Sequence, residues 1–143
     1  MILVDANLLL YAYDSSAARH RPARRWLEDV LSGEDAVRFA LVSLLAFLRV
    51  STNSAVFRRP LSSRDAIALV TAWLDVPVAG IAEPTERHWS VLEDLGGRGQ
   101  ARGPLLMDAH LAALAIEHGA MLYTTDRDFA RFPKLRFRDP LEA

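Results

Sequence analysis

The sequence predicts an α/β fold, a single domain over residues 1–143 with a mostly parallel central sheet of four to five strands and helices on both faces. Short apolar runs typical of buried strands alternate along the chain with longer stretches of helical periodicity, the pattern of parallel α/β proteins. The length suits one domain with a full hydrophobic core. No repeat or linker divides the chain.

The strands are expected in short apolar runs that are bounded by polar or turn-forming residues. These runs are Met1–Val4, Val37–Val42, Pro77–Ile81, Met121–Thr125 and a short fifth at Leu135–Arg138. Because helical stretches separate them, we expect right-handed crossovers between parallel neighbours.

Helices are expected between the strands, at Asn7–Tyr13, His20–Leu31, Leu44–Ser51, Arg64–Leu74, Glu86–Leu95 and Leu105–His118. Pro22 suits the first turn of the second helix, where a missing N–H costs nothing. Ser43 is predicted to cap the third helix, and Gly119 to end the last one at the position after the C-cap. The glycine-rich segment Gly96–Pro104 is the one clear loop.

Composition narrows the classes of protein that this chain could be. The formal net charge is −1, so any case for nucleic acid must come from local patches. The absence of cysteine excludes disulfides and thiolate metal sites, and it is compatible with a cytoplasmic location. No apolar stretch has the length of a membrane span. The opening run contains Asp5 and no basic leader, so we expect a strand and a helix rather than a signal peptide.

Acidic residues fall where such a sheet presents its ligand site, beyond the carboxyl ends of the strands. Asp5 follows the first strand, Asp126 follows the fourth, and Asp128 comes two residues later. Asp108 lies in the first turn of the helix before the fourth strand. Carboxylates brought together repel one another and are costly to desolvate, and a divalent cation offsets that cost. Ligands that are all oxygen favour Mg²⁺ or Mn²⁺ over Zn²⁺.

Each carboxylate alone also has an ordinary structural explanation. Asp5 could be a helix cap, Asp108 a partner of the helix dipole, and Asp126 with Asp128 a solvated turn. The functional interpretation therefore rests on their coincidence at one edge. The histidines are interpreted as structural or solvated, because no pair has the i, i+4 spacing of zinc ligands; they are His20, His88, His110 and His118. Neither a G-x-S-x-G nucleophile elbow nor a lysine-containing phosphate loop is present.

Four segments resemble the PIN-domain ribonucleases, and most closely the VapC toxins of bacterial type II toxin–antitoxin modules. The segments are Val4–Asn7, Phe47–Asn53, Met107–Ala115 and Thr124–Phe129. The resemblance covers essentially the whole chain. It implies a Mg²⁺- or Mn²⁺-dependent endoribonuclease that cleaves RNA, is held inactive by a VapB-like antitoxin and forms a homodimer.

The resemblance also assigns roles residue by residue. Asp5 matches the first acidic ligand, Asp108 the acid at the start of the late helix, and Asp126 the acid after the last core strand. Asp128 is an auxiliary candidate for the metal, and Asn7 occupies a polar position beside the first acid. Asp5 and Asp108 are expected to hold the principal metal, with Asp126 completing the acidic pocket and orienting the attacking water.

One position departs from the family pattern. The family usually carries a glutamate just before the segment that begins at Phe47, and here that residue is Ala46. The departure keeps open a degenerate PIN domain that binds RNA or protein without cleaving. A third alternative is an aspartyl-phosphate phosphatase, since strand-Asp-x-Asn superficially resembles the opening of the haloacid dehalogenases. Asn7 stands where those enzymes have their acid, so this alternative lacks a proton donor.

Phosphate steering is expected from arginines near the pocket, although any one of them alone is more often a solvated surface charge. The candidates are Arg49, Arg58, Arg59, Arg98 and Arg102.

Overall fold

The computed structural model describes residues 1–98 and 100–142, so Gly99 of the predicted loop lies outside the described residues. Five strands form one sheet in the order β3-β2-β1-β4-β5, and every neighbouring pair is parallel. The strands are β1 (Ile2–Val4), β2 (Val37–Ala40), β3 (Ala79–Ala82), β4 (Met121–Tyr123) and β5 (Phe137–Arg138). The predicted fold class is confirmed.

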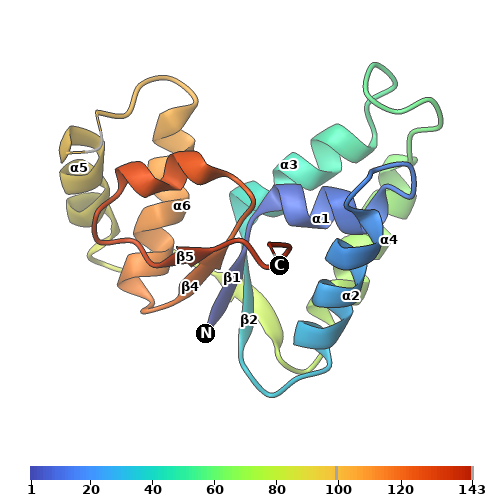
Figure 1. Ribbon diagram of the computed structural model, residues 1–143, viewed down its shortest axis with the longest axis horizontal. Helices are drawn as coiled ribbons and strands as arrows, with labels where there is room; N and C mark the ends of the chain where they lie inside the picture. Colours follow the sequence, from blue (N-terminus) through green and yellow to red (C-terminus); the bar gives the residue numbers. More distant parts are fainter. Residues whose placement is uncertain (99, 143) are drawn as a thin grey trace.

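Helices cover both faces of this sheet, as predicted (Figure 1). One side carries α1 (Ala6–Tyr13), α2 (His20–Leu31), α3 (Leu41–Ser51) and α4 (Ser63–Leu74). The other side carries α5 (His88–Arg98), α6 (Leu105–Glu117) and the short 3₁₀ helix η1 (Arg127–Arg131). In the described part of the chain no helix combines the length and apolar character needed to cross a bilayer.

The central strand β1 takes part in the cores on both faces. Ile2 and Val4 pack into the apolar cluster under α1 to α4, whereas Leu3 between them packs into the cluster under α5, α6 and η1. Successive side chains of a strand point to opposite faces, so three buried residues suffice to anchor both layers. The residue after β1 is thereby fixed at the carboxyl edge of the sheet.

Two local predictions were wrong. Ser43 does not cap α3, because the extended backbone of Ala40 at the end of β2 passes directly into a helix that begins at Leu41. Gly96 and Gly97 belong to α5 rather than to a loop. Buried Leu95 and the 2.9 Å ion pair between Asp94 and Arg98 hold this last turn, against a cost of about 1 kcal/mol for each helical glycine. The predicted end of α6 is confirmed, since Gly119 has a φ of +64°.

Candidate active site

Asp5 is the most constrained carboxylate at the carboxyl edge of the sheet. It directly follows β1 and caps α1, and its Oδ1 accepts a hydrogen bond of 2.7 Å from the backbone N–H of Ala6. Its Oδ2 accepts a second bond of 2.7 Å from the hydroxyl of Thr124. The predicted cap and the predicted site residue are therefore the same side chain, and both of its oxygens are held in place.

Thr124 joins Asp5 to the segment that carries Asp126. The Thr124 hydroxyl donates to Asp5 and also accepts from the backbone N–H of Asp126 at 3.0 Å. This threonine is 1% exposed, just beyond the end of β4. Sequence reasoning gave Thr124 no role, because nothing in a local pattern tells which threonine will bridge two strands that are neighbours only in the folded sheet.

Asp126 and Asp128 form the turn that enters η1. The Asp126 carboxylate caps this helix by accepting from the backbone N–H of Asp128 at 2.8 Å, and the Asp128 side chain is exposed. The turn explanation therefore holds for both residues. Asp126 lines a cavity of about 490 Å³ with Arg127, Arg138 and other residues, whereas Asp5 and Asp108 line another cavity.

Electrostatics nevertheless connect all four carboxylates, which we call the acidic cluster (Asp5, Asp108, Asp126 and Asp128). Burial and the charges of the other three acids, Asp126 most strongly, raise the pKa of Asp108 from 3.8 to about 6, although Arg131 opposes this. Burial also raises the pKa of Asp5, against the hydrogen bonds from Thr124 and Ala6 and with a further contribution from Asp126. Such mutual repulsion is what a bound cation relieves.

The donor set of the acidic cluster suits a hard cation in its chemistry. All side-chain donors are oxygens, and the amide Oδ1 of Asn7, in the first turn of α1, is buried with no hydrogen-bond partner among the described residues. Within residues 1–98 and 100–142, however, no three His, Asp or Glu side chains are arranged so that they could hold an ion between them. Asp5 and Asp108 are the pair that share a cavity, and Mg²⁺ commonly binds to one or two carboxylates while keeping several waters.

Asp5 and Asp108 lie on the wall of a cavity of about 540 Å³, here named the α3–α6 cavity. Its lining residues are Asp5, Ala6, Val42, Ser43, Leu45, Ala46, Arg49, Met107, Asp108 and Leu111. Ala46 is thus on the same wall as the two acids. The position that departs from the family pattern does face the candidate site.

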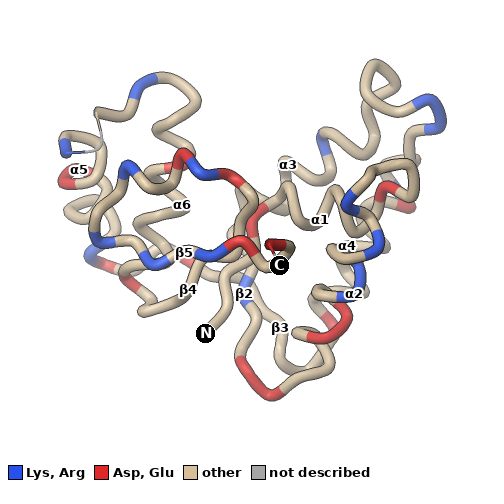
Figure 2. The backbone as a smooth tube through the Cα atoms, viewed as in Figure 1, with Lys and Arg blue, Asp and Glu red and all other residues tan. Residues whose placement is uncertain are grey.

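Basic residues accompany this edge of the sheet (Figure 2). Arginines lie on α3, on the loop after it and on the connection between α5 and α6, while acidic residues mark the turn between α2 and β2 at the opposite end of the strands. Of the predicted arginines, Arg49 reaches the α3–α6 cavity. Arg58 and Arg59 line a separate pocket with Tyr13, and Arg98 pairs with Asp94.

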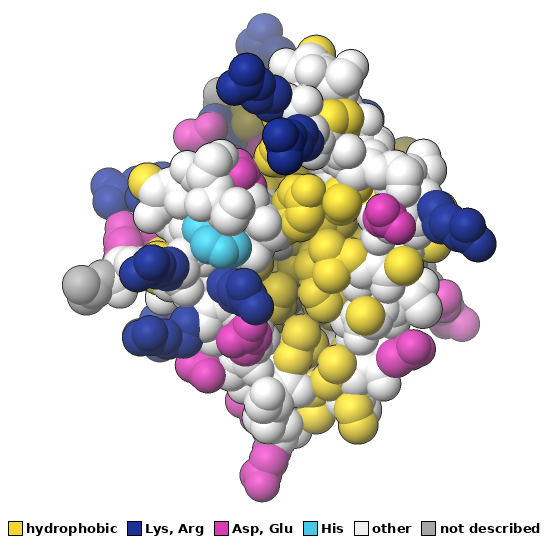
Figure 3. Space-filling model, turned by 90° about the vertical axis from the view of Figure 1, so that its right-hand side faces the viewer, with side chains coloured by type: hydrophobic (Ala, Val, Ile, Leu, Met, Phe, Trp, Pro, Cys, Tyr) yellow, Lys and Arg dark blue, Asp and Glu magenta, His cyan; other side chains and the backbone are white. Residues whose placement is uncertain are grey.

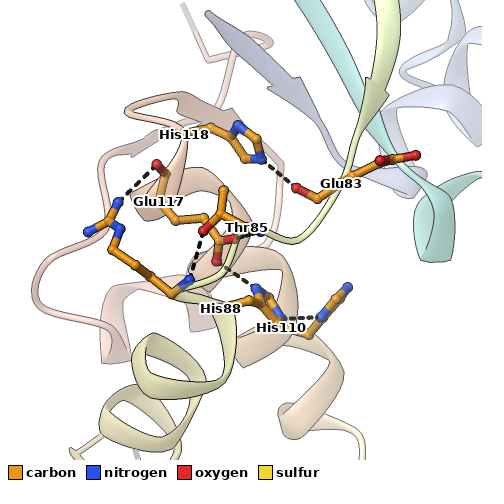
Figure 4. A network of polar contacts seen from close by, with 7 residues as sticks. Glu83, Thr85, His88, His110, Glu117 and His118 are labelled. Atoms are coloured by element: carbon orange, nitrogen blue, oxygen red, sulfur yellow. Dashed lines mark hydrogen bonds and ion pairs between the residues drawn. The ribbon is translucent and has the colours of Figure 1, made fainter.

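A second polar cluster joins α5 to α6 (Figure 4). The side chain of Glu117 accepts from the backbone N–H of Thr85 and contacts His88 Nδ1, both at 2.6 Å, and His88 Nε2 lies 2.8 Å from His110 Nδ1. Burial alone would raise the pKa of Glu117, but the hydrogen bonds from Thr85 and His88 outweigh it and lower that pKa. In the structure His88 and His110 link α5 to α6 through these polar contacts.

Comparison with known proteins agrees with this architecture. Residues 2–135 match the model of the PIN domain family. The chain is 45% identical over 140 residues to Ribonuclease VapC37 of Mycobacterium tuberculosis, covering 98% of this chain and 97% of that protein.

Solved structures are similar in fold. VapBC2 from Rickettsia felis, bound to a promoter DNA fragment, gives a TM-score of 0.71 at 17% identity, over 96% of this chain and 98% of that one. VapC20 of Mycobacterium tuberculosis, described as a sarcin-ricin loop cleaving toxin, gives a TM-score of 0.67 at 20% identity, over 95% of this chain and 99% of that one. With this fold and a relative so similar over nearly its whole length, the chain belongs to the PIN-domain family and, within it, to the VapC ribonucleases.

Proposed function

We propose that this protein is an endoribonuclease that uses Mg²⁺ or Mn²⁺ to hydrolyse RNA phosphodiester bonds in the cytoplasm, as the toxin of a type II toxin–antitoxin pair. The proposal is carried by the acidic cluster at the carboxyl edge of the sheet, where burial and the charges of the neighbouring carboxylates raise the pKa of Asp108 to about 6. It is supported by the 45% identity to a protein named as a ribonuclease.

Each residue of the acidic cluster has a distinct part in this proposal. Asp5 and Asp108 would hold the cation together with water, and Asp128 is an auxiliary ligand. When bound, the cation would make a water more acidic and offset negative charge on the phosphate. Thr124 and the Ala6 N–H fix the orientation of the Asp5 carboxylate. Asp126 would orient the attacking water and accept its proton as the water oxygen bonds to phosphorus. The bond to the leaving ribose oxygen breaks, and that oxygen takes up a proton from solvent water.

The partner of the toxin would be a VapB-like antitoxin. VapBC2 from Rickettsia felis and VapBC-1 from Haemophilus influenzae are pairs of this kind. An arginine of the antitoxin would suit the acidic cluster, because a guanidinium pairs with carboxylates in a bidentate manner and would compete with the cation.

A cleft between α2 and α4 is an apolar surface to which this partner could bind (Figure 3). The space-filling view shows a band of hydrophobic side chains with charged groups on both sides. Apolar lining comes from Ala12, Tyr13, Leu27, Leu31, Leu69 and Trp73, and His20, Arg24 and Glu28 stand at the border. We assign this cleft to an apolar segment of the antitoxin.

A homodimer is part of the same proposal. Large apolar side chains are exposed on α3 and α4, with Leu41 at 55% and Ile67 at 54%. Exposed apolar groups of this size commonly mark protein interfaces. Sedimentation of the purified protein would test the dimer.

The central test is RNA cleavage by purified protein with Mg²⁺, with Mn²⁺ and with EDTA. We expect cleavage only with a cation, and its loss in Asp5→Asn and in Asp108→Asn, since both keep the side-chain shape and remove the charge. Asp75→Asn, exposed after α4, is the matched control and should cleave as the wild type does. Cleavage at the wild-type rate by either active-site variant would contradict these assignments.

The same experiment separates the alternatives. RNA binding without cleavage under any cation would favour the degenerate domain, for which the alanine at position 46 is the supporting observation. A trapped aspartyl-phosphate would favour the phosphatase.

A further inference from the structure

The α3–α6 cavity is larger and more apolar than the binding of a cation requires. Its volume of about 540 Å³ lies within the range of about 300–1,000 Å³ typical of small-molecule sites. The rest of its lining is mostly apolar and comes from α3 and α6, namely Val42, Leu45, Ala46, Met107 and Leu111. A ligand that fills this space must present an apolar surface next to a group that the acidic cluster can act upon.

Two of the wall residues are poorly covered by the protein itself. Leu45 and Met107, from different helices, are each 54% exposed. The thioether of methionine is polarisable and adapts to flat ligands. An apolar contact is therefore available beside Asp108, the residue next to Met107.

Arg49 adds a free positive charge to the same cavity. Its guanidinium makes no hydrogen bond or ion pair with any residue of the described ranges, although Asp5 and Asp108 line the cavity with it. An arginine left without a partner can bind a phosphate in a bidentate manner or stack on a flat ring. The cavity thus combines an apolar lining, the positive charge of Arg49 and the carboxylates of Asp5 and Asp108.

We propose that the α3–α6 cavity seats an unpaired nucleobase of the RNA, that of a nucleotide next to the cleaved phosphodiester bond, with Arg49 on the backbone phosphate. A nucleobase is flat, has an apolar face and is covalently tied to the phosphate, so it matches all three parts of the cavity. Unpaired bases are the parts of RNA that proteins reach most readily. The assignment rests on the proposed ribonuclease function and makes the enzyme selective for single-stranded segments.

The size of the side chain at position 46 limits the room for a base in the α3–α6 cavity. Its methyl group lies on the cavity wall on α3, so a larger apolar side chain there would fill the seat without adding charge. Ala46→Leu is therefore the main variant. Ala68→Leu is its matched control, because residue 68 is exposed on the neighbouring helix α4 and the same change there leaves the cavity open.

The experiment pairs these variants with a substrate change. A short RNA that the wild type cleaves is compared with versions that lack the base on one side or the other of the cleaved bond. Single-turnover cleavage is measured with Mn²⁺. Binding of each RNA, intact or abasic, is measured in EDTA from the fluorescence anisotropy of a dye at one end of the RNA.

We expect removal of one of the two bases to weaken wild-type binding and cleavage by about 10-fold or more, as for the loss of a stacked base. Ala46→Leu should weaken both to a similar degree on intact RNA but have little further effect on the abasic RNA. Ala68→Leu should match the wild type on both. If Ala46→Leu does not fold, Met107→Ala is the second variant, and its loss should likewise be confined to the RNA that carries the base.

Three results would overturn the assignment. The first is equal cleavage of abasic and intact RNA by the wild type. The second is an effect of Ala46→Leu that is the same on both RNAs. The third is a change of sedimentation from dimer to monomer in Ala46→Leu, which would mean that the cavity binds a second copy of the chain rather than RNA. Absence of any RNA cleavage by the wild type would instead refute the proposed function.

Discussion

At the scale of single residues, Asp108 is expected to destabilise the cation-free fold and to serve as a ligand of the proposed cation. It lies half-buried in the first turn of α6, where the helix dipole favours negative charge, yet the other acids of the cluster and burial raise its pKa to about 6. At neutral pH and without a cation, its ionised form therefore destabilises the fold. With a bound cation, the ionised form of Asp108 would instead stabilise the fold.

Asp108→Asn should consequently stabilise the cation-free protein at pH 7.5. With a folded pKa of about 6 against an ordinary value of 3.8, the folded state holds the proton more tightly, so the free energy of unfolding falls as pH rises between these values. Discounted for solvent screening, the gain should be about 1–2 kcal/mol. Urea unfolding in EDTA measures it.

The gain of Asp108→Asn should shrink as pH falls through the folded pKa of about 6 and vanish only below about pH 3, where the wild-type carboxyl is protonated in both the folded and the unfolded state. Asp75→Asn, outside the acidic cluster, should show no comparable gain. Saturating Mn²⁺ should stabilise the wild type more than Asp108→Asn. A variant that is no more stable than the wild type in EDTA at pH 7.5 would show that the repulsion is screened away.

Residues also show where sequence reasoning succeeds and fails. Asp5, Asp108 and Asp126 could be placed at one edge from the sequence, because each one's position relative to a strand is local information and parallel strands share their carboxyl edge. The bridge from Thr124 to Asp5 joins residues 119 positions apart, and no local pattern encodes it. The role of Ser43 was mispredicted for a related reason, since tertiary packing decides where a helix begins.

At the scale of elements, α5 depends on polar contacts with α6. Glu117, whose side chain is fully buried, accepts from the backbone N–H that precedes α5 and contacts His88 in its first turn. Arg87 donates to the backbone carbonyl of the same glutamate at 3.1 Å. This network fixes the start of α5 against the end of α6.

Glu117→Gln should therefore destabilise the protein by about 1–3 kcal/mol at pH 7.5, because it removes the charge from buried hydrogen bonds. The pKa of Glu117 is lowered from 4.5, so its contribution is present above that value and is lost as pH falls through the folded pKa. The gap between variant and wild type should accordingly narrow in acid.

Unfolding in urea at pH 7.5 and near pH 3.5 tests this, with hydrogen exchange in α5 as a second measurement. Glu93→Gln, exposed on the same helix, is the control and should be nearly neutral. Equal loss of stability at both pH values would mean that the shape of the side chain matters rather than its charge.

At the scale of the whole molecule, two apolar cores meet at a thin sheet. The clusters under α1 to α4 and under α5 to η1 are separate, and β1 contributes to both through three consecutive residues. The fold class followed from the alternation of strands and helices in the sequence. The division into two cores, and the cavities at their junction, depend on side-chain packing that the alternation does not specify.

Leu3→Ala tests how far the two halves act as one unit. Leu3 is 1% exposed at the centre of the sheet, so the truncation should cost about 2–5 kcal/mol, with a single transition for both halves. Val56→Ala removes apolar groups from a site that is 56% exposed in the loop after α3, and it should change stability by no more than about 0.5 kcal/mol. The comparison uses urea unfolding followed by fluorescence and circular dichroism, and two separated transitions would show that the halves unfold independently.

The strand order has a consequence for the protein during its own synthesis. β1 and β4 are neighbours in the sheet, but Thr124, which binds Asp5, lies 119 residues after it and is therefore synthesised later, together with Asp126. When the chain has been synthesised as far as residue 100, Asp5 has been made, but Asp108 and Asp126 of the proposed site have not. If these carboxylates form the catalytic site as proposed, we expect the nascent chain to be unable to cleave the RNA that encodes it until β4 and the turn after it have been synthesised.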